Sequence, residues 1–140
     1  MSGGLLDAKA IVRSFLLDRP AIKGLKARVV GKTPDSTEQP WVRITLIDPQ
    51  NRTGINRVEH LVSYYLQFDC YAGASGGEPE AFELAKAVRS ALVEDLPDSV
   101  LEEAVVTDVV AISMHPMPDT DLDDARDRFI LDVEICMHPR

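Results

Sequence analysis

The sequence predicts an α+β fold in which a mostly antiparallel sheet of about five strands carries two helices packed on one face. Three observations predict it. Two segments repeat apolar residues at helical spacing, several short segments alternate or are β-branched, and most strands follow one another without an intervening helix. The expected order of elements is α-β-β-β-α-β-β. The length of 140 residues fits one domain spanning residues 1–140.

The first helix is expected over residues 4–18. Its apolar residues fall at the spacing of one helix face: Ala8, Ile11, Val12, Phe15 and Leu16. Pro20 should end this helix, because the residue before a proline avoids the α region. A short β-branched strand is expected over residues 25–32, and residues 33–40 form a loop.

Two further strands are expected over residues 41–48 and 60–71, and both alternate apolar with polar side chains. In the second strand the apolar face is Val62, Tyr64, Leu66, Phe68 and Cys70. Its opposite face is polar but carries Tyr65 and Tyr71. Because tyrosine is enriched at protein interfaces, we expect this face to contact another chain.

The second helix should follow the small-residue turn at residues 73–77. Pro79 is expected at its first position, where a missing N–H has no cost, and Pro97 should end the helical region. Small and apolar residues at helical spacing would let this helix lie close on the sheet. The last two strands are expected over residues 105–115 and 128–138.

The net charge of −8 argues against proteins that coat or read nucleic acid, which need a basic surface for phosphates. It also argues against binding to an anionic membrane surface. No apolar run approaches the roughly 18 residues of a membrane helix, and no export signal is expected. Cys70 and Cys136 are therefore expected to be free thiols.

No motif for catalysis, a metal or a cofactor is found in the sequence. The run from Asp119 to Asp124 has alternating aspartates like a calcium loop, but Asp124 stands where the turn needs glycine and Ile130 where glutamate is needed. The glycines of the 73–77 turn lack the spacing of a phosphate-binding loop. Catalytic residues brought together from distant parts of the sequence remain an open alternative, as in a small ligand-binding or enzymatic α+β domain.

Four stretches of the chain together resemble the tail-terminator, or tail-completion, proteins of bacteriophages with long non-contractile tails. They are LLDAKAIVRSFLLDRPAI with the strand that follows it, PWVRITL, YYLQFDCYAGASGGEPEAFELAKAVRSAL and DARDRFILDVEI. These patterns cover nearly the whole chain. None of them has a catalytic signature.

The resemblance implies a structural virion protein that forms a ring, commonly a hexamer, on the head-proximal end of the tail. The ring would stop growth of the tail tube and present a joining surface to a head-completion or neck protein. DNA would only pass through its lumen, and assembly would take place in the host cytoplasm. Another head–tail connector or neck protein and an accessory subunit of a different complex are the alternatives. No cofactor, metal or membrane is implied.

Two long polar segments are the expected contact regions of such a ring. Residues 48–59 carry Arg52 and Arg57, whereas residues 119–127 are mainly acidic. The acidic segment contributes Asp119, Asp121, Asp123 and Asp124, followed by Arg126. Since a closed ring joins two different patches of one protein, we expect these oppositely charged segments to meet across a subunit boundary or to contact tube and neck proteins.

Overall fold

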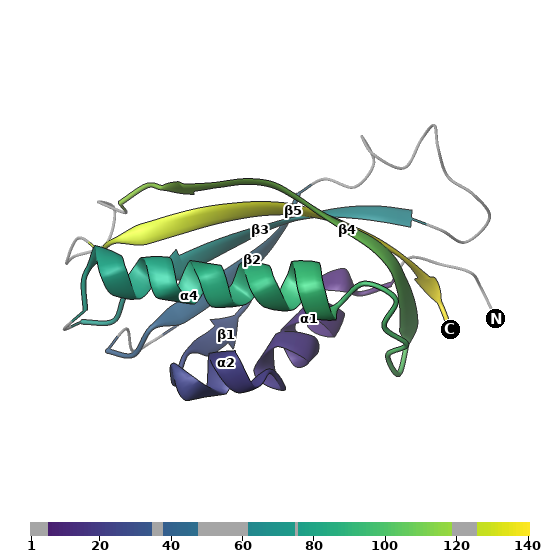
Figure 1. The fold of residues 1–140 in the computed structure, drawn as a ribbon, viewed down its shortest axis with the longest axis horizontal. Coiled ribbons are helices and arrows are strands. Elements are labelled where there is room, and N and C mark those ends of the chain that lie inside the picture. Colours follow the sequence, from purple (N-terminus) through teal and green to yellow (C-terminus); the bar gives the residue numbers. More distant parts are fainter. Residues whose placement is uncertain (1–5, 35–37, 48–61, 75, 119–125) are drawn as a thin grey trace.

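The computed structural model describes residues 6–34, 38–47, 62–74, 76–118 and 126–140. Within them, five strands form one sheet in the spatial order β1-β2-β3-β5-β4, and the helices pack on one side of it (Figure 1). The elements are α1 (Ala8–Leu17), α2 (Pro20–Gly24), β1 (Arg28–Val30), β2 (Trp41–Ile47), β3 (Val62–Tyr71), α4 (Glu78–Ser90), η1 (Ala91–Asp95), β4 (Ala104–Pro116) and β5 (Arg128–Pro139). The predicted α+β class is confirmed.

The sheet is mixed, with one parallel pair at an edge. β1 runs parallel to β2, with Arg28 opposite Trp41, while β2–β3, β3–β5 and β5–β4 are antiparallel. A mostly antiparallel sheet was expected, and this remains correct. Residues 31–40 connect the two parallel strands, and a connection of this length is needed because a tight hairpin joins only antiparallel strands.

The N-terminal helical region differs from expectation in two respects. α1 begins at Ala8, where the carboxylate of Asp7 accepts a hydrogen bond from Ala10 N at 3.2 Å, so the expected start at residue 4 was too early. A short helix, α2, was not predicted. Pro20, expected to end the first helix, also occupies the first turn of α2, where its fixed φ is favourable.

The strand expected over residues 25–32 is only β1, Arg28–Val30. The residues before it close the end of α2 instead: Leu25 N donates to Ala21 O at 3.3 Å and Lys26 N donates to Lys23 O at 3.0 Å. Lys26 has a φ of 56°, which turns the chain out of the helix and into the strand.

The second long helix, α4, begins at Glu78 with Gly77 as its N-cap. Pro79 is therefore the second helical residue and not the first, and Glu78 is helical although a proline follows it. After Ser90 the helix continues as the single π-helical turn η1, in which Leu96 N donates to Ala91 O at 3.1 Å.

The core lies between the helices and one face of the sheet. Of the apolar side chains expected to point inward from β3, Tyr64, Leu66, Phe68 and Cys70 are buried, and the side chain of Val62 lies outside the described part of the chain. The predicted apolar faces of α1 and α4 cover them, including Phe15 and Leu84. Both cysteines are free thiols, Cys70 buried and Cys136 half-buried.

Candidate interaction surfaces of the sheet

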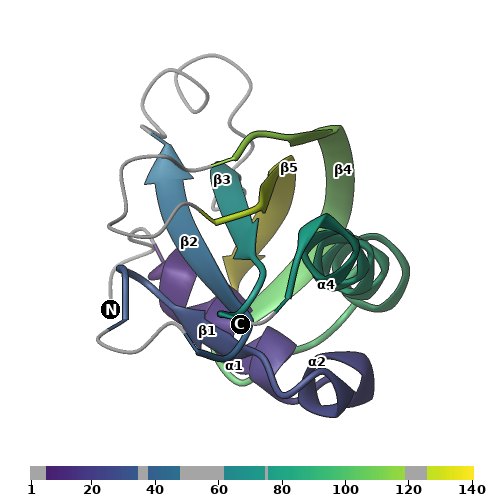
Figure 2. The same ribbon diagram turned by 90° about the vertical axis from the view of Figure 1, so that its left-hand side faces the viewer.

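The helices α1, α2 and α4 leave the opposite face of the sheet without helical cover (Figure 2). Strand alternation sends every second residue of β2, β3 and β5 to this open face. Registry places Arg43 of β2 beside Asp69 of β3, and Tyr71 of β3 beside Arg128 of β5. The polar side chains of three neighbouring strands therefore converge at one end of the open face.

Asp69 is the centre of this group and is buried, with 1% of its surface exposed. Its Oδ2 lies 2.6 Å from Arg43 Nη2 and 3.8 Å from Arg128 Nη1. Gln67 Nε2 donates to its other oxygen, Oδ1, at 2.9 Å. A buried carboxylate needs such partners, because its removal from water is otherwise costly. We call Arg43, Asp69, Tyr71 and Arg128 the charge cluster.

Tyr71 completes the charge cluster on the open face. Its hydroxyl oxygen accepts hydrogen bonds from Arg43 Nη2 at 3.0 Å and from Arg128 Nη1 at 3.3 Å. Its ring stacks on Trp41 with the centroids 3.8 Å apart, and both rings are fully buried. Two cations thus share one carboxylate and one phenol oxygen, which fixes β2, β3 and β5 in their mutual register.

Arg128 also connects the charge cluster to both ends of the acidic segment. Its Nε donates to Met117 O at 2.8 Å, and Met117 N donates to Arg128 O at 2.7 Å. On the other side, Ala72 N donates to Asp127 O at 3.1 Å. The chain therefore leaves β4 and enters β5 at points that the charge cluster holds in place.

The residues expected to form an interface fall into two groups. Six lie outside the described residues: Arg52, Arg57, Asp119, Asp121, Asp123 and Asp124. Of the others, Tyr65 and Arg126 are half-buried, and Tyr71 is buried within its own chain. A contact of these residues with another chain stays a prediction. Because Tyr71 is buried, its part in such a contact would be to position Arg43 and Arg128 by hydrogen bonds.

A family model described as "Tail completion protein gp17" matches residues 10–136. The chain belongs to this family. It is a structural protein of a phage-type tail, as the resemblance seen in the sequence implied. No curated protein sequence matches it.

The tail-completion fold of this chain is also found in a solved structure described as "Virion of native gene transfer agent (GTA) particle". The matched chain is 18% identical in sequence, with a TM-score of 0.63 and 93% of each chain covered. At this identity the similarity establishes a shared fold across nearly the whole chain.

β4 provides the second accessible region of this tail-completion protein. It is an edge strand of 13 residues with two register shifts, and it exposes Val110 and Ile112. Met117, which follows it, is 50% exposed. A long edge with apolar side chains is a surface on which another chain can pack.

Sequence reasoning missed the charge cluster. Alternation placed Arg43 on the face of its strand opposite Val42, and it placed Asp69 on the polar face that was expected to contact another chain; Arg128 was placed at the start of the last strand. The signal available was an aspartate opposite an arginine on adjacent predicted strands. The sequence did not show that Tyr71 and Trp41 would stack and exclude water from the pair.

The described residues hold one group with a strongly shifted acidity. Burial, and after it the negative charge of Asp69, raises the pKa of the Cys70 thiol well above its usual range, so this thiol stays protonated. Among the residues that the structure describes, no three His, Cys, Asp or Glu side chains lie close enough together to hold a metal ion. No described helix is long and apolar enough to cross a membrane.

Proposed function

We propose that this protein forms a ring, of six subunits, on the head-proximal end of a phage-type tail, where it ends growth of the tail tube and joins the tail to a head-completion or neck protein. The proposal treats residues 1–140 as one tail-terminator-like domain and requires no catalysis, metal or cofactor. Assembly would take place in the host cytoplasm before the ring becomes part of the virion.

The observation that carries the proposal is membership of the tail completion family over residues 10–136. A chain with the same fold in a virion of a gene transfer agent supports assembly with other virion proteins. The open face fits this role, because the charge cluster makes it rigid while the edge strand β4 leaves apolar side chains accessible.

Electron microscopy of the purified protein mixed with tail tubes tests the proposal. We expect rings at one end of each tube, and tubes that grow no further when tube protein is added. Protein that stays free of the tubes would contradict a terminator role. If the protein instead binds a purified head-completion protein and ignores tubes, it is a neck component, the nearest alternative.

DNA is expected to pass through the ring without being held. The net charge of −8 per chain repels phosphate, and it makes a lumen that does not retain the genome. Tight binding of double-stranded DNA by the isolated ring, measured by gel shift at physiological salt, would contradict this part of the proposal.

A further inference from the structure

Two stretches of the chain carry charge of a single sign. Residues 19–34 contain no acidic side chain but five basic ones: Arg19, Lys23, Lys26, Arg28 and Lys32. Residues 94–103 contain no basic side chain but five acidic ones: Glu94, Asp95, Asp98, Glu102 and Glu103. Both stretches are described throughout, so the surfaces that they form can be located.

The later part of the basic stretch, from Lys26 to Lys32, runs along the edge of the sheet formed by β1, which pairs only with β2, whereas Arg19 stacks on Phe15 of α1. Two side chains of α1 add to it. Lys9 Nζ lies 3.4 Å from where a Cβ on Gly31 would be, and Arg13 Nε donates to Val29 O at 2.7 Å. We call Lys9, Arg13, Lys26, Arg28 and Lys32 the basic edge. All are exposed except Lys9, which is half-buried.

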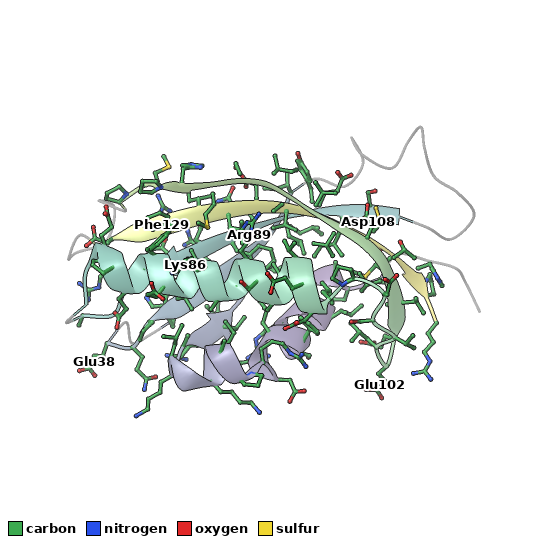
Figure 3. All side chains as sticks on the ribbon, in the orientation of Figure 1. Glu38, Lys86, Arg89, Glu102, Asp108 and Phe129 are labelled. Carbon is green, nitrogen blue, oxygen red and sulfur yellow. The ribbon has the colours of Figure 1, made fainter. Side chains whose placement is uncertain are left out.

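The acidic stretch forms one wall of a groove of about 660 Å³, and α1 forms the other. Its apolar lining includes Val100, which is 61% exposed, and Phe15, which is buried with the guanidinium of Arg19 4.4 Å from its ring centre. Its rim carries Asp95, Glu102 and Glu103, all exposed. We call this the acidic groove. Figure 3 shows Glu102 pointing away from the body of the molecule.

The carboxylates of the rim are available to a partner. Asp18, which also lines the groove, already pairs with Arg19 at 3.5 Å and with Lys23 at 3.6 Å. By contrast, Glu102 and Glu103 form no ion pair within the described part of the chain. The groove therefore combines one exposed apolar side chain, Val100, with two carboxylates that form no ion pair in the described part of the chain, and Arg19 is the cation that also lines it.

The basic edge and the acidic groove lie on different sides of α1. Successive residues of an α-helix are rotated by about 100°, so Lys9 and Arg13 share one side while Ile11 and Phe15 share another. Two distinct and complementary patches on one protein are what a head-to-tail contact requires, whereas a two-fold dimer would use a single patch twice.

We propose that the acidic groove of one subunit receives the basic edge of the next copy in the ring. The inference rests on the proposed ring and names the surfaces that join its subunits. Opposite charges would set the orientation and speed the encounter, and the exposed side chain of Val100 would contribute apolar surface to the centre of the contact. Screening of the charges by salt should weaken the contact.

Charge reversal with matched controls tests the inference. Glu102→Lys and Lys32→Glu are each expected to raise the protein concentration needed for half-assembly by about tenfold or more, because like charges would then face each other. Glu83→Lys and Lys86→Glu make the same changes at exposed sites on α4 and should assemble as the unchanged protein does. Native mass spectrometry and light scattering give the ring population, and circular dichroism confirms folding.

Restoring ring assembly by combining the charge reversals of both patches is the stronger test. Glu102→Lys with Glu103→Lys, combined in one chain with Lys9→Glu and Lys32→Glu, should restore assembly that each pair alone abolishes. Folded variants that assemble like the controls, or a combined variant that does not recover, would overturn the inference. So would rings that form normally but no longer attach to tubes, since the groove would then bind the tube protein.

The unchanged protein separates the two proposals. If it forms rings, alone or on tubes, and the variants do too, only the surfaces assigned here are wrong. If it forms no ring under either condition, the proposed function itself fails, and this inference with it.

Discussion

At the scale of single residues, Asp69 determines whether the open face of the sheet is stable. Its carboxylate is the counter-ion of two arginines and lies buried beneath them. Removing one member of a buried ionic group leaves the others desolvated and unpaired, which is far more costly than losing an exposed ion pair.

Asp69→Asn is expected to lower the free energy of unfolding by about 3 kcal/mol or more, because Arg43 and Arg128 would then lack a negative partner. Urea denaturation measures the change. Asp18→Asn is the matched control, since Asp18 is 73% exposed in its ion pairs, and it should cost no more than about 1 kcal/mol. Equal stability of the two variants would show that the charge cluster contributes little.

Individual side chains were predicted unequally well. The inward faces of the strands followed from alternation alone, because an apolar side chain is buried almost regardless of which neighbours it packs against. The partners of Arg43 could not be predicted, since they depend on the register of three strands. That register is set by the whole sheet and not by any local pattern.

At the scale of elements, the turn between β3 and α4 depends on Gly73. Its N–H donates to Glu80 Oε1 at 2.7 Å, and the next residue, Ala74, donates to Glu38 O at 3.0 Å. A Cβ on Gly73 would lie 2.3 Å from that same Glu38 oxygen. The turn therefore packs backbone against backbone, with no space for a side chain.

Gly73→Ala should destabilise the fold by about 1 to 3 kcal/mol, because backbone atoms must move to admit the methyl group. Gly24→Ala in α2 serves as the control. No atom lies within 4 Å of the new methyl there, and stability should stay level or rise by up to about 1 kcal/mol. Thermal unfolding followed by circular dichroism compares them. If Gly73→Ala leaves the stability unchanged, the backbone at Glu38 can move away from the new methyl group at little cost in free energy.

The ends of the helices and strands were predicted less well, because different local sequence preferences oppose each other there. Pro20 was expected to stop one helix, and the same fixed φ also allows it to start another, so α2 was missed. The length and β-branching of residues 25–32 suggested a longer strand. The hydrogen bonds that close α2 use residues 25–27 of that stretch, and residues 31–32 already bend away from the sheet, so β1 has three residues.

At the scale of the whole molecule, the segments that carry Arg52 and Arg57 and the four aspartates remain the predicted contact regions. The described structure joins the two ends that flank the acidic segment, since Arg128 Nε donates to Met117 O at 2.8 Å. These segments would add to the contact between the basic edge and the acidic groove.

Reversing charge with Arg52→Glu and Arg57→Glu is expected to abolish ring formation or joining to the tail and to leave the monomer folded. Loss of attraction to the aspartates, or to partner proteins, is the physical reason. Light scattering and electron microscopy with tail tubes report assembly, and circular dichroism reports folding. Lys86→Glu on α4 is the control for an added negative charge, and unchanged assembly in the double variant would remove this hypothesis.

The fold class and the order of most elements could be predicted because they depend on periodicity and on connection length. The parallel pairing of β1 could not, since it depends on the path taken by residues 31–40. The surfaces proposed for assembly emerged only when residues distant in sequence were placed side by side.

The position of β5 in the sheet has a consequence for biosynthesis. β5 is the last strand of the five in the chain, yet it lies between β3 and β4 and is paired along its length on both sides. In a nascent chain that has not yet released β5, β3 is paired with β2 alone and β4 has no partner strand, so the helices have an incomplete surface to cover. Chains cut short before Arg128 should therefore fail to fold, and interrupted translation would supply no half-formed subunits to a growing virion.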